Sequence, residues 1–127
     1  MTTVVLDASA VLALMFDEAG ADKVLAVVGD AVISTVNFSE VVTKLVDHGA
    51  EHETAASHVA SLGIGVIGFD QAQAVLAAGL RQGSRRLGLS LGDRACLALA
   101  EARTLPVFTA DRAWGSVPTK LRIVQIR

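Results

Sequence analysis

Residues 91–111 read LGDRACLALAEARTLPVFTAD, and this stretch decides the fold class. Apolar residues at helical spacing in its first part predict a strongly amphipathic helix over Leu91–Arg103. The run Pro106–Thr109 (PVFT) predicts a short strand that ends just before an aspartate. The start of the chain pairs a strand with an acid in the same way, because Thr3–Leu6 (TVVL) is followed directly by Asp7. Strand, acid and helix therefore recur at both ends of the chain.

Between these two stretches, short apolar runs continue to alternate with helical patterns. Further strands are predicted at Ala31–Ser34, Gly65–Phe69 and Leu121–Ile126, and helices at Ala8–Phe16, 19–28, Val36–Val46, 51–62 and 70–82. Residues 83–90 are predicted to be a loop, and residues 111–115 a short turn or helix. Strands that alternate with helices favour a mostly parallel sheet covered on both faces. The predicted fold class is therefore α/β, a three-layer α/β/α sandwich formed by one domain over residues 1–127.

The composition excludes several classes of protein. The 127 residues include 11 basic and 13 acidic ones, a formal net charge of −2, and 52% are hydrophobic, which suits one packed core. The single cysteine, Cys96, excludes a disulfide framework and a thiolate metal cage. Aromatic residues make up only 4%, so a sheet that stacks RNA bases on aromatic rings is not expected. Neither a membrane-spanning stretch nor a secretory signal is recognisable, so we expect a soluble, cytoplasmic protein without membrane contact.

The charges are unevenly distributed along the chain. Residues 1–80 carry ten acids and two lysines, a net charge of −8, whereas residues 81–127 carry eight arginines, one lysine and three acids, a net charge of +6. An arginine-rich half is a reasonable footprint for phosphate groups. Arg85 and Arg86 in the predicted loop, and Arg112, are candidate contacts to RNA phosphates. The alternatives are a solvated surface or a contact between subunits.

Four acids occupy equivalent places in the predicted pattern. Asp7 and Asp111 follow strands, while Glu40 and Asp93 lie early in helices. In a parallel sheet all strands end at one edge and the following helices begin there, so these side chains are expected to meet in one crevice. Asp93 follows a loop rather than a strand, which makes its place at this edge the least secure of the four.

Each of these acids also has a purely structural interpretation. Asp7 and Asp111 could be helix N-caps, residues 90–93 (SLGD) resemble a capping box, and residues 37–40 (NFSE) resemble a looser one. Acids in a first helical turn also interact favourably with the helix dipole. The local sequences around the acids are what favour a functional interpretation.

The segments Leu-Asp7-Ala-Ser9, Asn37-Phe-Ser-Glu40, Leu-Gly-Asp93 and Phe-Thr109-Ala-Asp111 occur together and in this order. In this respect the whole chain resembles the PIN-domain nucleases and, among them, the VapC toxins of type II toxin–antitoxin systems. The resemblance implies that the catalytic and metal-binding acids are Asp7, Glu40, Asp93 and Asp111. It further implies that Ser9 and Thr109 are supporting hydroxyls and that Asn37 is a polar neighbour.

This resemblance also implies a PIN-like fold, an endoribonuclease activity that depends on Mg²⁺ or Mn²⁺, a homodimer, and a VapB-type antitoxin as partner. The residues agree with this chemistry independently, because hydrolysis of an RNA phosphodiester needs an activated water and stabilisation of negative charge. Carboxylates alone as ligands favour Mg²⁺ or Mn²⁺ over zinc. The identity of the RNA, the number of metal ions and the separate roles of Glu40 and Asp93 stay open.

Other functions fit the residues less well. A phosphatase of the haloacid dehalogenase type would have a second aspartate where Ser9 stands, and a phospho-receiver domain would have a lysine after the strand that leads to Asp111. The runner-up is a housekeeping RNA-processing PIN nuclease, and a non-catalytic RNA-binding module is a further alternative. The three histidines are interpreted as surface residues, Cys96 as a core residue, and Trp114 as packing at an exposed edge.

Overall fold

The computed structural model describes residues 2–127, and its centre is a parallel sheet of five strands. In the order β3-β2-β1-β4-β5, neighbouring strands are hydrogen-bonded to each other. The strands are β1 (Val4–Leu6), β2 (Ala31–Ser34), β3 (Gly65–Ile67), β4 (Val107–Thr109) and β5 (Ile123–Gln125). Val5 of the central strand pairs with Val32 on one side and Val107 on the other. All four pairings are parallel, so the strands end at one edge of the sheet.

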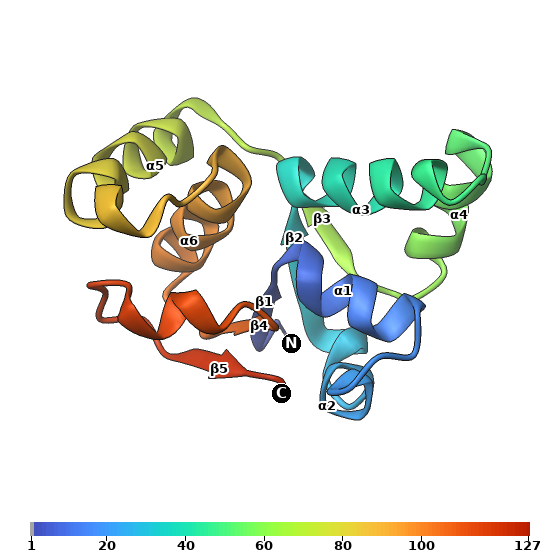
Figure 1. Ribbon diagram of the computed structural model, residues 1–127. Helices are drawn as coiled ribbons and strands as arrows, with labels where there is room; N and C mark the ends of the chain where they lie inside the picture. Colours follow the sequence, from blue (N-terminus) through green and yellow to red (C-terminus); the bar gives the residue numbers. More distant parts are fainter. Residues whose placement is uncertain (1) are drawn as a thin grey trace.

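Helices cover both faces of this sheet and confirm the three-layer α/β/α class (Figure 1). The α-helices are α1 (Ala8–Met15), α2 (Ala21–Leu25), α3 (Thr35–Asp47), α4 (His52–Ala60), α5 (Gln71–Ser84) and α6 (Leu91–Arg103). Three short 3₁₀ helices, η1 (Val28–Asp30), η2 (Arg85–Leu87) and η3 (Arg112–Ser116), complete the chain. Helices α1 to α4 lie on one side of the sheet, and α5 and α6 lie on the other (Figure 1).

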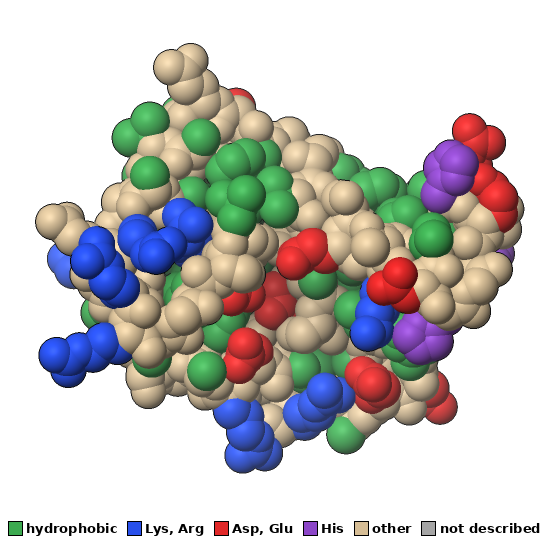
Figure 2. Space-filling view, turned by 45° about the horizontal axis from the view of Figure 1, so that its top comes forward, with side chains coloured by type: hydrophobic (Ala, Val, Ile, Leu, Met, Phe, Trp, Pro, Cys, Tyr) green, Lys and Arg blue, Asp and Glu red, His purple; other side chains and the backbone are tan. Residues whose placement is uncertain are grey.

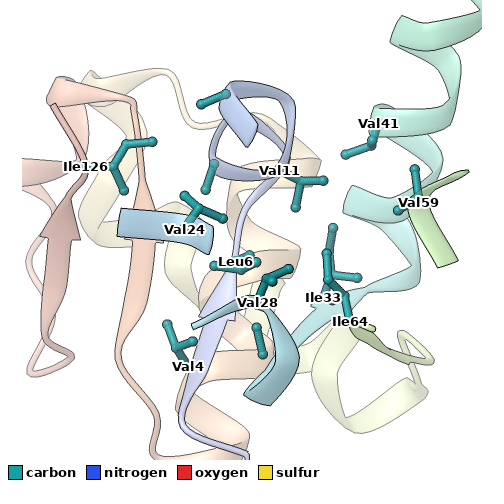
Figure 3. Close-up of a cluster of buried hydrophobic side chains, with 13 residues drawn as sticks. Val4, Leu6, Val11, Val24, Val28, Ile33, Val41, Val59, Ile64 and Ile126 are labelled. Carbon is teal, nitrogen blue, oxygen red and sulfur yellow. The ribbon is translucent and has the colours of Figure 1, made fainter. Parts of the chain in front are cut away.

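The protein has a hydrophobic core on each face of the sheet, and the central strand contributes to both because its side chains alternate between the two faces. Val4 and Leu6 belong to a buried cluster with residues of α1, α2, α3 and α4 (Figure 3). Val5 faces the opposite way, into a second cluster with residues of α6. The apolar run at the start of the chain is therefore buried on both sides, as a central parallel strand requires.

Helix α6 has the predicted bounds but not the predicted amphipathic character. Residues 95–100 are all buried, so the helix has no wide polar face along its middle. The sheet, α3 and α5 pack around it, and the alanines and the cysteine in this run are small enough to let these neighbours approach closely. The prediction of a strongly amphipathic helix was therefore wrong, because α6 is covered on three sides.

Three smaller predictions also differ from the structure. Helix α5 continues to Ser84 and η2 follows it, so most of the predicted loop over residues 83–90 is helical. The predicted helix over residues 19–28 is divided into α2 and η1. Trp114 is only 1% exposed and belongs to the second core, which contradicts packing at an exposed edge.

Within residues 2–127, no helix is both long and apolar enough to cross a membrane.

Candidate metal centre

Asp7 lies at the carboxyl end of β1, where its side chain accepts four short hydrogen bonds. The backbone N–H of Ala10 donates to Oδ1 over 2.8 Å, so Asp7 is the N-cap of α1, as one of the two interpretations expected. The Ser9 hydroxyl lies 2.7 Å from Oδ1 and 2.9 Å from Oδ2, and the Thr109 hydroxyl donates to Oδ2 over 2.5 Å. The carboxylate is 5% exposed. It is thus a buried acid that one hydroxyl from α1 and one from the end of β4 hold in one orientation.

The surroundings of Asp7 disfavour its charged form. Burial raises the pKa of the Asp7 carboxyl from 3.8 to about 6, and the charge of Asp93 adds to the increase. The hydrogen bonds from Thr109, Ser9 and Ala10 work in the opposite direction without cancelling the effect of burial. A positive charge beside this carboxylate would stabilise its charged form and lower its pKa again, so the position suits a cation.

Asp111 is joined to this group through its backbone rather than through its carboxylate. Its N–H donates to the Thr109 hydroxyl over 3.0 Å, and the neighbouring Ala110 N–H donates to the Ser9 hydroxyl over 2.9 Å. The Asp111 carboxylate is exposed and caps η3 by accepting from the Ala113 N–H over 2.9 Å. The structure therefore places Asp111 at the predicted edge, next to the Asp7 network, with its side chain in a capping position.

Glu40 approaches the same edge from α3. This helix begins at Thr35 and is capped by Ser34, so the interpretation of residues 37–40 as a looser capping box was wrong. Instead, the Asn37 amide donates to Glu40 Oε1 over 2.8 Å and to the Gly92 carbonyl over 2.9 Å. One buried side chain thus orients the Glu40 carboxylate and joins α3 to the first turn of α6.

Gly92 is a residue of the site that sequence reasoning did not single out. A Cβ atom at this position would lie 2.5 Å from both carboxylate oxygens of Glu40, closer than any real contact allows. Glycine therefore permits α3 and α6 to meet with Glu40 between them. The signal was available, since glycine is a poor helix former and here stands in a first helical turn directly before Asp93.

Asp93 forms the predicted capping box at the start of α6. Its Oδ2 accepts from the Ser90 N–H over 2.9 Å, and its own N–H donates to the Ser90 hydroxyl over 3.1 Å. The same carboxylate is close enough to Asp7 to raise the pKa of that acid. Capping and membership of the acidic group are therefore compatible, because the N-terminus of α6 points its first turn at the edge where β1 ends.

The buried thiol of Cys96 shows which of these acids lie close to one another, because its pKa responds to their charges. The thiol is fully buried, and its burial raises its pKa, with further increases from the charges of Asp7, Asp93 and Glu40. Three acids from β1, α3 and α6 thus act on one buried point. Asp111 does not contribute to these shifts.

The donor set suits a hard divalent cation, although the side chains are not gathered in coordinating positions. In residues 2–127 no three His, Cys, Asp or Glu side chains come close enough together to hold a metal ion. The side chains that bind Asp7, those of Ser9 and Thr109, carry oxygen atoms, however, and oxygen ligands favour Mg²⁺ or Mn²⁺. His48, His52 and His58 are exposed on α3 and α4, as expected for surface histidines.

The candidate RNA-binding arginines are exposed on short helices beside this centre. Arg85 and Arg86 lie on η2, and Arg112 lies on η3 directly after Asp111. In Figure 2, acidic side chains lie near the middle of the visible face, and Lys and Arg side chains gather on the left, over α5 and η2. Arg85 and Arg86 therefore belong to the basic surface at one side of the acids, whereas Arg112 lies directly beside Asp111.

Comparison with known proteins identifies the family and the fold. The sequence matches the family model of the PIN domain over residues 4–120. No curated protein matches the chain by sequence. A toxin–antitoxin complex from Klebsiella pneumoniae contains a chain that is 20% identical, with a TM-score of 0.76 over 98% of both chains.

Two further structures share the fold. The DNA-bound VapBC complex from Salmonella typhimurium is 18% identical, with a TM-score of 0.76 over 100% of both chains. VapC20 of Mycobacterium tuberculosis, a toxin that cleaves the sarcin–ricin loop, is 16% identical, with a TM-score of 0.72 over 94% of this chain and 99% of that chain. At these identities the likeness establishes a common fold. Together with the family match from β1 to the segment before β5, it shows that the chain belongs to the PIN domain family.

Proposed function

We propose that this protein is a metal-dependent endoribonuclease of the VapC type, which hydrolyses phosphodiester bonds in RNA. The observation that carries the proposal is the state of Asp7, a buried carboxylate with a raised pKa and a second acid nearby. Burying such a charge without a positive partner is costly, so the arrangement is best explained by a function that supplies one. A fold built only for stability would gain by replacing this acid.

We propose Asp7, Glu40, Asp93 and Asp111 as the residues that hold Mg²⁺ or Mn²⁺. When bound, such a cation activates a water and neutralises charge on the phosphate oxygens. Ser9 and Thr109 fix the direction of the Asp7 carboxylate by hydrogen bonds, and the Asn37 amide does the same for Glu40. Asp93 and Asp111 need little movement of the backbone to take part, because each already lies at the carboxyl edge of the sheet.

We also propose a VapB-type antitoxin as partner, a homodimer, and a cytoplasmic location. Several chains with this fold were solved in toxin–antitoxin complexes, which supports the choice of partner. Residues 95–100 of α6 cannot form the dimer interface, because they are buried inside the chain. Leu91 at the start of α6, Leu25 and Val75 are among the large apolar side chains left exposed, so the interface would have to use exposed positions of this kind.

The test is cleavage of RNA by the purified protein in the presence of Mg²⁺, Mn²⁺ or EDTA. We expect cleavage with either metal, none with EDTA, and a loss of at least about 100-fold in Asp7→Asn, in line with the contribution of a catalytic group. Asp22→Asn is the matched control, since it removes an equal charge from an exposed position on α2 and should retain activity. RNA binding without cleavage in every metal would support the non-catalytic alternative. Cleavage that a co-expressed antitoxin fails to suppress would favour the housekeeping nuclease.

A further inference from the structure

Three arginines lie within six residues of one another at the end of α5. Arg81 is in the last turn of α5, and Arg85 and Arg86 follow on η2. Ser84 between them has φ −122° and ψ 10°, so α5 ends there and the arginines are divided between two successive helical segments. All three side chains are exposed, and we call them the α5 arginine cluster.

The α5 arginine cluster has no counter-charge among the described residues. No carboxylate of residues 2–127 lies within ion-pair distance of any of its three guanidinium groups. Like charges that lie close together in the sequence repel each other. Cations at a helix C-terminus are favourable, which explains one arginine here more readily than three. An anionic partner from outside the chain would explain the whole cluster.

The surface around the cluster is concave and polar. A depression of about 510 Å³ is lined by Gln82, Gly83, Arg85 and Arg86. No apolar side chain lines it, so it offers nothing for the apolar face of a docking peptide helix. Guanidinium groups match phosphate oxygens in a paired geometry, and a glutamine amide can donate to the same oxygens. The chemistry therefore suits a phosphate backbone better than a protein segment.

The position of the cluster relative to the candidate metal centre is fixed by the core. Residues 88–90 connect η2 to α6, and Asp93 lies in the first turn of that helix. Leu89 in this connection is 8% exposed and packs into the second core with Cys96 and Leu97. A buried side chain therefore anchors the connection between the arginines and the first turn of α6.

From these observations we infer that the α5 arginine cluster is a docking surface for the phosphate backbone of single-stranded RNA, outside the bond that is cut. This inference rests on the proposed nuclease function and adds a second contact region to it. The cluster holds phosphates of nucleotides that flank the scissile bond, and it does so without reading the bases, since no aromatic side chain lines the depression. Substrates long enough to reach both regions therefore gain affinity that very short ones lack.

Binding is tested first, without cleavage, in the Asp7→Asn background. Fluorescence anisotropy with a labelled 20-nucleotide single-stranded RNA is measured over a range of salt concentrations. Changing Arg81, Arg85 and Arg86 to glutamine should weaken binding for RNAs of unrelated sequence and make the slope of log affinity against log salt shallower by about 2, because each single-strand phosphate contact contributes about 0.7. The matched control changes Arg103, Lys120 and Arg122 to glutamine, which removes the same charge from exposed positions outside the cluster.

Cleavage then separates this inference from the proposed function. With all catalytic acids intact, the ratio of kcat/KM for the 20-nucleotide RNA to that for a trinucleotide should fall in the cluster variant and stay constant in the control variant. Equal salt slopes for the two variants, or an unchanged ratio, would overturn the docking surface while leaving the nuclease intact. RNA affinity that survives in the cluster variant while affinity for the co-expressed antitoxin falls would assign the arginines to that protein instead. Failure of the wild-type protein to cut any RNA, with the binding difference preserved, would remove the proposed function and keep the docking surface.

Discussion

The most informative perturbation is Asp7→Asn, measured as a change in folding stability without metal. The Asp7 carboxyl has a pKa of about 6 in the folded protein because burial disfavours its charged form, against 3.8 for an unperturbed aspartate. The folded state therefore holds this proton more tightly than the unfolded state does. The stability contributed by the protonated form is complete below about pH 4, and it is lost as the pH rises through 6.

The size of this effect follows from the difference between the two pKa values. About two units at 1.36 kcal/mol per unit give roughly 3 kcal/mol of stability lost between pH 4 and pH 7. Asparagine carries no charge and keeps an oxygen for the Ala10 N–H, but its hydrogen bonds to the Ser9 and Thr109 hydroxyls are weaker than those of a carboxylate. We therefore expect Asp7→Asn to be more stable than wild type by about 1–3 kcal/mol at pH 7.5.

The assay is urea unfolding in EDTA at several pH values for wild type, Asp7→Asn and the control Asp22→Asn. The difference in free energy of unfolding between wild type and Asp7→Asn reports on the Asp7 carboxyl alone, because the contributions of the other titrating residues cancel. It should be near zero or reversed at pH 4 and largest above pH 7. Added Mg²⁺ should then stabilise wild type more than Asp7→Asn, since a ligand stabilises the state that binds it. A wild-type protein at least as stable as Asp7→Asn at pH 7.5 in EDTA would refute the reasoning.

Three other predictions test the rest of the site. Gly92→Ala should displace the Glu40 carboxylate into solvent, so the affinity for Mn²⁺ and the rate of cleavage should fall. The free energy of unfolding in urea should stay within about 1 kcal/mol of wild type. Retained cleavage would show that Glu40 is dispensable. Asp93→Asn should abolish cleavage and gain less melting temperature from Mg²⁺, whereas Ser90→Ala should lose about 1 kcal/mol from the capping box and still cut RNA. An Asp93→Asn protein that still cuts RNA would leave only the capping role for this acid. Light scattering should give twice the 13.2 kDa of one chain; the mass of a monomer at all concentrations would contradict the dimer.

Features set by neighbouring residues in the sequence could be predicted well. The second strand, Ala31–Ser34, and the helix Leu91–Arg103 have the predicted bounds, because β-branched runs and caps act within a few residues. The capping box around Asp93 and the N-cap role of Asp7 were recognisable for the same reason. The acids that follow strands were expected at one edge of the sheet, because parallel strands all end at the same edge.

Features set by distant contacts could not be predicted from the sequence. The burial of residues 95–100 of α6 depends on α3, α5 and the sheet, which the local pattern of apolar residues does not encode. The need for glycine at position 92 comes from Glu40, which lies on another helix. The position of Trp114 beside Asp111 suggested packing at an exposed edge, and only the second core shows why it is buried.

The central position of β1 has a consequence for how the protein folds during synthesis. Strand β1 is synthesised first but cannot complete its pairing until β4 has been made, and the hydrogen bond between Asp7 and Thr109 joins residues 102 positions apart. A nascent chain that ends before Thr109 leaves one side of β1 unpaired and Asp7 without its second hydroxyl partner. Contacts of such long range slow folding, because a large loop must close before they form. An incomplete chain on the ribosome would therefore hold the acids without the surroundings that arrange them, so truncated chains should lack the activity proposed above.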